Sequence, residues 1–263
     1  MKNNRYKILV LSDLKSATVN TLKSSISLAK MIDGEIDFFH VKKPTDIVEQ
    51  ESQLSAIRTI NELHTATSKE IQEIIAPISK EYNVSIGCKH AFGNVKNEIS
   101  DYVDQTKPDI IVLGKRKTKT FSFVGDNITD YVIKNHDALI MIASEDKTLE
   151  PNSELSLGFL NNIEDVSNYA FTESILNYSQ KPLTSFKVAN KSSKSSKEQA
   201  STTKRTIEYV FEDGANTANS LSNYVAKSDV NLLFVNKYNK VGSSNTNIKE
   251  LINKVDVSLL ISA

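Results

Sequence analysis

Short apolar runs alternate with helical patterns along the chain, and this alternation limits the folds that the chain can adopt. The run Tyr6–Leu11 is apolar at nearly every position, which is typical of a strand buried on both faces. Leu22 and Ile26 then follow at helical spacing, and Glu35–Val41 forms the next strand-like run. Strands that alternate with helices predict an α/β fold with a parallel sheet covered on both faces.

One helical pattern is much longer than the others. Apolar residues recur at helical spacing from about 47 to 82, and Pro77 must kink this helix or split it in two. In the next strand-like run, 84–92, Cys88 takes a place in the alternation that favours a small buried residue.

The second half of the chain repeats the order of the first. Ser100–Val103 matches Ser222–Val225, and Asp137 opens an apolar run as Asp256 does. The sequence therefore predicts two tandem five-stranded parallel sheets, each with its helices.

The repeats give the domain boundaries. We expect a first domain over 1–146, a linker over 147–153 and a second domain over 154–263. The second repeat lacks the long helix and has in its place the polar, Ser-rich and basic segment 191–205, whose composition is typical of a mobile loop.

Composition excludes several classes of protein. The chain has 263 residues with 32 basic and 32 acidic side chains, and this zero net charge argues against general nucleic-acid binding. No apolar run approaches the roughly 20 residues of a membrane-spanning helix, so we expect no membrane partner. The first residues show no signal-peptide pattern, and Cys88 is the one cysteine, so we expect a cytoplasmic protein.

Several segments resemble the universal stress protein (UspA) family. They are "YKILVLSD" near the start, "FFHV" in the second strand, "GNVKNEI" at a helix start, and "DIIVLG" with "NITDYVIKNHDALIMIAS" at the end of the first repeat. The chain is similar to a tandem member. The resemblance implies Rossmann-like domains of the HUP superfamily that pair through their last strands, here as a pseudo-dimer, with a further homodimer open.

The resemblance also implies a place for a nucleotide. Members that bind ATP use an Asp after the first strand, a residue after the second strand and a glycine-rich loop after the fourth strand, and Asp13, Val41 and Gly114 match these positions. Lys115, Lys117, Gly125 and Asn127 complete the candidate nucleotide-binding set.

The loop departs from the family pattern. Lys117 stands where the second glycine is expected, and Asp126 stands near the phosphate position, where its charge would repel the ligand. Asn127 with Asp130 resembles a capping box that would satisfy the helix start without a ligand, and Asn247 with Glu250 repeats it.

The second repeat departs further. It has Asn161 and Asn236 where Asp13 and Gly114 stand in the first, so we expect its site to be lost. Asp13 itself has a simpler explanation, since Asp is favoured in turns that follow parallel strands.

No catalytic or metal-binding arrangement emerges from the sequence. The four histidines, His40, His64, His90 and His136, are scattered; we expect His40 to be packed and His64 to lie on a solvated helix face. The main hypothesis is a non-enzymatic stress-response protein without a cofactor that acts through protein partners. The alternative is a regulatory switch that binds ATP in the first repeat and hydrolyses it slowly.

Overall fold

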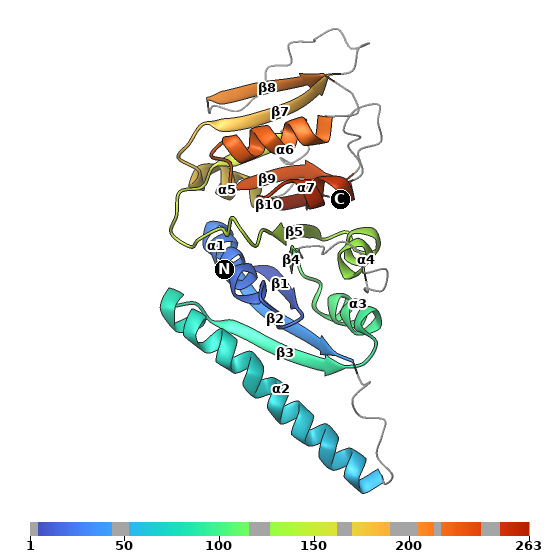
Figure 1. Ribbon diagram of the computed structural model, residues 1–263. Coiled ribbons are helices and arrows are strands. Elements are labelled where there is room, and N and C mark those ends of the chain that lie inside the picture. The colour runs from blue at the N-terminus through green and yellow to red at the C-terminus, as the bar shows by residue number, and fades with distance from the viewer. Residues whose placement is uncertain are drawn as a thin grey trace.

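The computed structural model describes residues 5–43, 53–115, 127–161, 170–189, 205–212, 217–237 and 248–262. Within these ranges the chain forms one continuous sheet with helices on both faces (Figure 1). The strands are β1 Tyr6–Ser12, β2 Gly34–Lys42, β3 Ile86–Phe92, β4 Ile110–Gly114, β5 Leu139–Ala143, β6 Leu157–Leu160, β7 Leu183–Ala189, β8 Thr206–Glu212, β9 Leu232–Asn236 and β10 Ser258–Ser262. The helices are α1 Thr18–Ile32, α2 Gln53–Tyr82, α3 Val95–Thr106, α4 Ile128–Asn135, α5 Thr172–Tyr178, α6 Thr217–Lys227 and α7 Ile248–Lys254.

The sheet has ten strands in the order β3-β2-β1-β4-β5-β10-β9-β6-β7-β8. The first five and the last five strands thus repeat one arrangement in mirrored order. Neighbours are parallel except at the centre, where β5 and β10 pair antiparallel, with Ile140 opposite Ile261 and Ile142 opposite Leu259. The predicted α/β class with mostly parallel strands is confirmed.

Each face of the sheet has one apolar core that continues from the first repeat into the second. On one face, Phe38 and Met141 belong to the same cluster as Leu260. On the other face, Phe39 and Ile140 belong to the same cluster as Leu259. Burial on both faces explains why the central strands are apolar at successive positions instead of alternating.

The segment between the repeats packs along α1. Lys23 on α1 forms an ion pair with Glu150 at 3.3 Å, and the Leu149 backbone N–H donates to Ser24 Oγ at 3.1 Å. Leu149 is also buried in the core. The residues that join the two repeats are therefore held against the first repeat.

Helix α2 is longer than the strands beside it. It continues through Pro77, so the predicted split does not occur. Its 30 residues span about 45 Å, whereas the seven residues of β3 span about 23 Å. Ile71, Ile75 and Ile78 cover the sheet, and the N-terminal half of α2 extends beyond it (Figure 1).

At the matching place in the second repeat, between β7 and β8, the structure describes Arg205 alone. The segment predicted as a mobile loop, 191–205, lies outside the described residues apart from Arg205.

Candidate functional site

Three of the predicted nucleotide-binding residues lie at the same edge of the sheet. β1 pairs in parallel with β2 on one side and with β4 on the other. Asp13 directly follows β1, Val41 lies near the end of β2 and Gly114 ends β4. Because parallel strands end at one edge, the fold brings these residues to the crevice in which α/β sheets bind ligands.

Asp13 shapes the turn from β1 into α1. Its Oδ1 accepts a hydrogen bond from the Lys15 backbone N–H at 3.2 Å. Between them, Leu14 has a positive φ of 59° and donates its N–H to Ser12 Oγ at 3.1 Å. The carboxylate thus has the turn-forming role that the sequence offers as the simpler explanation.

The end of β2 carries a packed histidine beside Val41. His40 is 7% exposed, and its Nδ1 lies 2.8 Å from the Ser12 carbonyl oxygen. Since a carbonyl accepts, the hydrogen is on Nδ1. This agrees with the expected packed role of His40, whereas Val41 is half-buried against the core on the α3 side.

Gly114 has a packing reason to be glycine. A Cβ at this position would lie 2.5 Å from Thr21 Oγ1 and 3.3 Å from Ala17 Cβ. The absence of a side chain therefore lets the start of α1 approach β4 closely. This requirement exists whether or not the loop holds a phosphate group.

Lys115 is directed toward the second repeat. Its Nζ donates to the Val255 carbonyl at 2.8 Å and to Asp256 Oδ1 at 3.2 Å. The matching residue of the second repeat, Lys237, pairs in turn with Asp137 at 3.8 Å. Two related ion pairs thus cross the junction between the repeats, and the ammonium of Lys115 is used there.

The predicted capping box at α4 is wrong. Asn127 is the N-cap residue, but its side chain forms no hydrogen bond to the helix backbone. Its Nδ2 donates instead to the carboxylate of Asp130, which also pairs with Lys249 on α7 at 2.7 Å. The first turn of α4 therefore presents a carboxylate engaged with the second repeat.

The remaining residues of the predicted loop lie outside the described residues. These are Lys117, Gly125 and Asp126, and Asn247 of the second predicted capping box.

In the second repeat, Asn161 has its own structural role. It has a positive φ of 68°, a conformation in which Asn is favoured, and its Oδ1 accepts from the Val188 N–H at 3.3 Å. Its backbone N–H donates to the Phe186 carbonyl at 2.8 Å. Asn161 thus joins the ends of β6 and β7.

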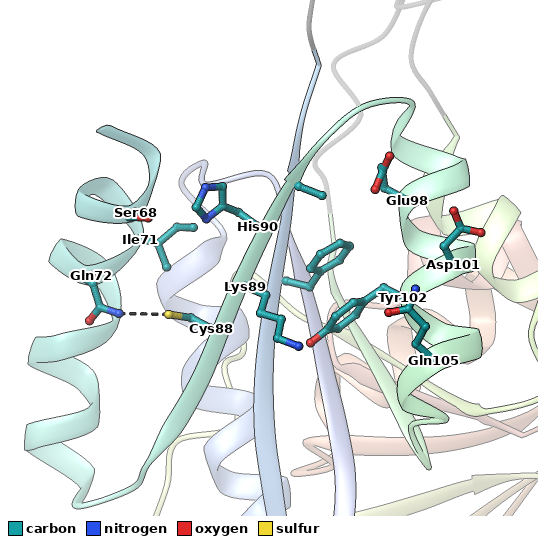
Figure 2. A pocket seen from close by; sticks show the side chains of 12 residues that line it. Ser68, Ile71, Gln72, Cys88, Lys89, His90, Glu98, Asp101, Tyr102 and Gln105 are labelled. Carbon is teal, nitrogen blue, oxygen red and sulfur yellow. Dashed lines mark hydrogen bonds between the residues drawn. The ribbon is translucent and has the colours of Figure 1, made fainter. Parts of the chain in front are cut away.

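A cavity of about 530 Å³ lies elsewhere, around the outer strand β3 (Figure 2). Ser68 and Gln72 of α2 line it on one side of the strand, and Glu98 and Asp101 of α3 line it on the other. Cys88 is half-buried here and its Sγ accepts from Gln72 Nε2 at 3.1 Å, so the expectation of a buried cysteine is wrong. None of the predicted nucleotide-binding residues lines this cavity.

The α3 side of the cavity is built around Tyr102. Its ring stacks on Phe39 with 4.1 Å between centroids, and its hydroxyl donates to Asp37 Oδ2 at 2.5 Å. Burial and the Asp37 carboxylate raise the pKa of the Tyr102 hydroxyl, which keeps it protonated. Lys89 Nζ lies over the same ring, 5.4 Å from its centroid.

Two histidines that are far apart in sequence meet on the other side of β3. His64 Nδ1 lies 2.9 Å from His90 Nε2, and the His64 ring lies 4.3 Å from that of Phe92. His64 is exposed, as expected for a solvated face, but the expectation of scattered histidines is wrong for this pair. Burial, with charge repulsion from His64, His40 and Lys42, lowers the pKa of His90.

The described residues contain neither a metal-binding cluster nor a membrane-spanning helix. No group of three or more His, Cys, Asp or Glu side chains is arranged to hold a metal ion there. No helix in those ranges has the length and hydropathy that crossing a membrane requires.

The fold defines a class: a tandem Rossmann-like α/β protein whose two repeats join through their last strands into one sheet. A sequence profile described as the universal stress protein family matches residues 5–142. A universal stress protein of Methanocaldococcus jannaschii is 24% identical over 142 residues, which cover 54% of this chain and 83% of that protein.

Solved structures agree over both repeats. A universal stress protein from Archaeoglobus fulgidus DSM 4304 covers 97% of this chain and 95% of its own with a TM-score of 0.66 at 12% identity. A putative universal stress protein from Pseudomonas aeruginosa UCBPP-PA14 covers 98% and 93% with a TM-score of 0.60, also at 12% identity. The chain belongs to the universal stress protein family.

Proposed function

We propose that this chain is a non-enzymatic, cytoplasmic universal stress protein that acts in stress response through protein partners and does not depend on a bound nucleotide. The observation that carries the proposal is the direction of Lys115. The first side chain after β4 donates to Val255 and Asp256 of the second repeat instead of facing the crevice beside Asp13. A cation that a phosphate would use is thus engaged elsewhere.

The start of α4 supports the same proposal. A helix N-terminus attracts anions through its unpaired N–H groups. Here the Asp130 carboxylate lies in the first turn, where its charge opposes a phosphate. Without a nucleotide to sense, the protein would act through its surface, by contacts with other proteins or with a second copy.

The test is a search for nucleotide in freshly purified protein, followed by calorimetry with Mg-ATP. We expect mass spectrometry to find no stoichiometric ATP or AMP, and calorimetry to show no binding at millimolar nucleotide. An Asp13→Ala variant serves as the control for specific binding. Nucleotide that is present in the wild type and lost in this variant would overturn the proposal.

The second candidate function is a nucleotide-binding switch in the first repeat. It is favoured by Asp13, Val41 and Gly114, which meet at neighbouring strand ends. The matched variant is Lys117→Gly with Asp126→Gly, which supplies glycine at two positions where the resemblance places it. If this variant binds ATP and the wild type does not, the loop residues account for the missing ATP binding. Binding of ATP by the wild type would favour the switch.

A further inference from the structure

The contact between His64 and His90 joins α2 to the outer strand of the sheet. Their facing nitrogens, Nδ1 and Nε2, are 2.9 Å apart. No role in the family function proposed above uses either ring. His64 lies in the N-terminal half of α2, and His90 lies near the C-terminal end of β3.

The spacing of the two nitrogens matches a metal-binding geometry. Transition metals bind imidazole nitrogen at about 2.0–2.1 Å. Two such nitrogens at a right angle, as in square-planar or octahedral coordination, lie about 2.9 Å apart. The separation is that of the hydrogen bond between the two rings, and it is also the distance that adjacent positions around one ion require.

We propose that His64 and His90 form a two-imidazole site for a divalent transition-metal ion of the copper(II) class, which fastens α2 to β3. Copper(II) prefers nitrogen ligands in tetragonal geometry and binds a given nitrogen site more tightly than the other divalent first-row ions. No third His, Cys, Asp or Glu completes the group in the described ranges, so water takes the remaining positions.

Binding needs a change of tautomer in the ring that donates the present hydrogen bond, and a rotation of the rings so that both lone pairs point at the ion instead of at the facing nitrogen. The hydrogen on its facing nitrogen moves through solvent to its other nitrogen, and both facing nitrogens then offer lone pairs. His64 is exposed, so its ring can rotate toward the ion.

The neighbouring residues give the site a defined position. His90 is held in the register of β2 and β3, opposite His40, and is half-buried. On its other side, Phe92 contacts the His64 ring.

Copper(II) titration of the full chain tests the proposal, with affinity from calorimetry and coordination from electron paramagnetic resonance. We expect one ion with two imidazole nitrogens in the spectrum, and a loss of affinity of about tenfold or more in His64→Gln and in His90→Gln. The double variant should lose no more than the single variants, since both rings serve one ion. Circular dichroism checks that each variant is folded.

Cys88→Ser is the matched control, because Cys88 lies two residues from His90 on the same strand. It should bind copper(II) as the wild type does. An equal loss of affinity in Cys88→Ser would overturn the proposal, as would unchanged affinity in His64→Gln or a spectrum with one coordinated nitrogen.

A second measurement tests the fastening of α2. Arg58 is exposed on α2, N-terminal to His64, so trypsin cleavage after it reports local opening of the helix. Copper(II) should slow this cleavage in the wild type and leave it unchanged in His90→Gln. Equal slowing in both proteins would show that the ion acts elsewhere and overturn the proposal.

Discussion

The same face of the outer strands differs between the two repeats. In the first repeat, Ile71 and Ile75 of α2 belong to the apolar core that includes Phe38 of the sheet, with Ile86 packed against it. In the second repeat, the matching face of β7 and β8 carries an ion pair and an exposed side chain.

The sequence of that face fits its exposure. Lys187 of β7 pairs with Glu208 of β8 at 2.9 Å, and Val210 beside them is 61% exposed. By strand register, Lys187 and Glu208 stand where the first repeat has His40 and Cys88, and the exposed Val210 stands where it has His90. The comparison teaches that strands in the same order can present either an apolar face packed by a helix or an exposed face with an ion pair.

The largest expected effect comes from truncating one apolar side chain in each repeat. Ile71→Ala should destabilise the protein by about 2–5 kcal/mol, because Ile71 is 1% exposed. Val210→Ala should change stability by less than about 0.5 kcal/mol, because its side chain is mostly in water. Urea denaturation of both variants measures the difference, and equal losses would break the comparison.

The next prediction concerns an exchange of the residues that end β4 and β9, which are Gly114 and Asn236. Gly114→Asn should cost about 1–3 kcal/mol, because any side chain there meets Thr21 and Ala17. The reciprocal change in the second repeat, Asn236→Gly, removes a side chain instead of adding one and should cost about 0.5–1 kcal/mol through backbone entropy. Thermal unfolding compares the two; a tolerated Gly114→Asn would show that α1 can move away from β4.

A smaller effect concerns the contact between the repeats. Asp130 and Lys249 lie on α4 and α7 with 2.7 Å between them, but Lys249 is half exposed. Solvent screening should limit their coupling to about 0.2–1 kcal/mol, and salt should reduce it further. A double-mutant cycle with Asp130→Ala and Lys249→Ala measures it at low and high salt. Coupling that does not change with salt would contradict this account.

The smallest effect at neutral pH involves His136, which precedes Asp137. At the matching place in the second repeat, Val255 precedes Asp256. His136 is 7% exposed, its Nε2 has no hydrogen-bond partner among the described residues, and burial lowers its pKa. The folded state therefore favours the neutral ring, and stability is lost as the pH falls below the unfolded pKa of about 6.5.

His136→Val tests this pH dependence by introducing the residue of the second repeat. Denaturation at pH 7.5 and at pH 5.5 should show a smaller loss of stability on acidification in the variant than in the wild type. His90 titrates in the same range, so His90→Gln in both backgrounds is the control. An unchanged pH dependence would show that His136 does not contribute.

The fold could be predicted because its signals are local and repeated. Apolar strands such as Tyr6–Leu11 and the spacing of Leu22 and Ile26 each indicate their element without knowledge of the rest. Pro77 could not be resolved in the same way. A proline costs helix stability, but packing of Ile75 and Ile78 on either side of it maintains α2.

The candidate site was predicted only in part. Asp13 follows β1 and Gly114 ends β4, so the fold places them together once the strand order is known. The hydrogen-bond partners of Lys115 belong to the other repeat, and the partner of His64 belongs to another secondary-structure element. A single sequence contains no signal for contacts of this kind. Asn127 was assigned the wrong partner because Asn can bond a backbone N–H or a neighbouring carboxylate with equal ease.

The antiparallel pairing of β5 with β10 has a consequence for assembly in the cell. Both strands belong to one chain and are joined through the segment that packs along α1, so each is present to the other at an effective concentration on the order of millimolar. Dilution or low expression cannot separate them. The central pair is thus fixed at synthesis in a one-to-one ratio, whatever the abundance of the protein.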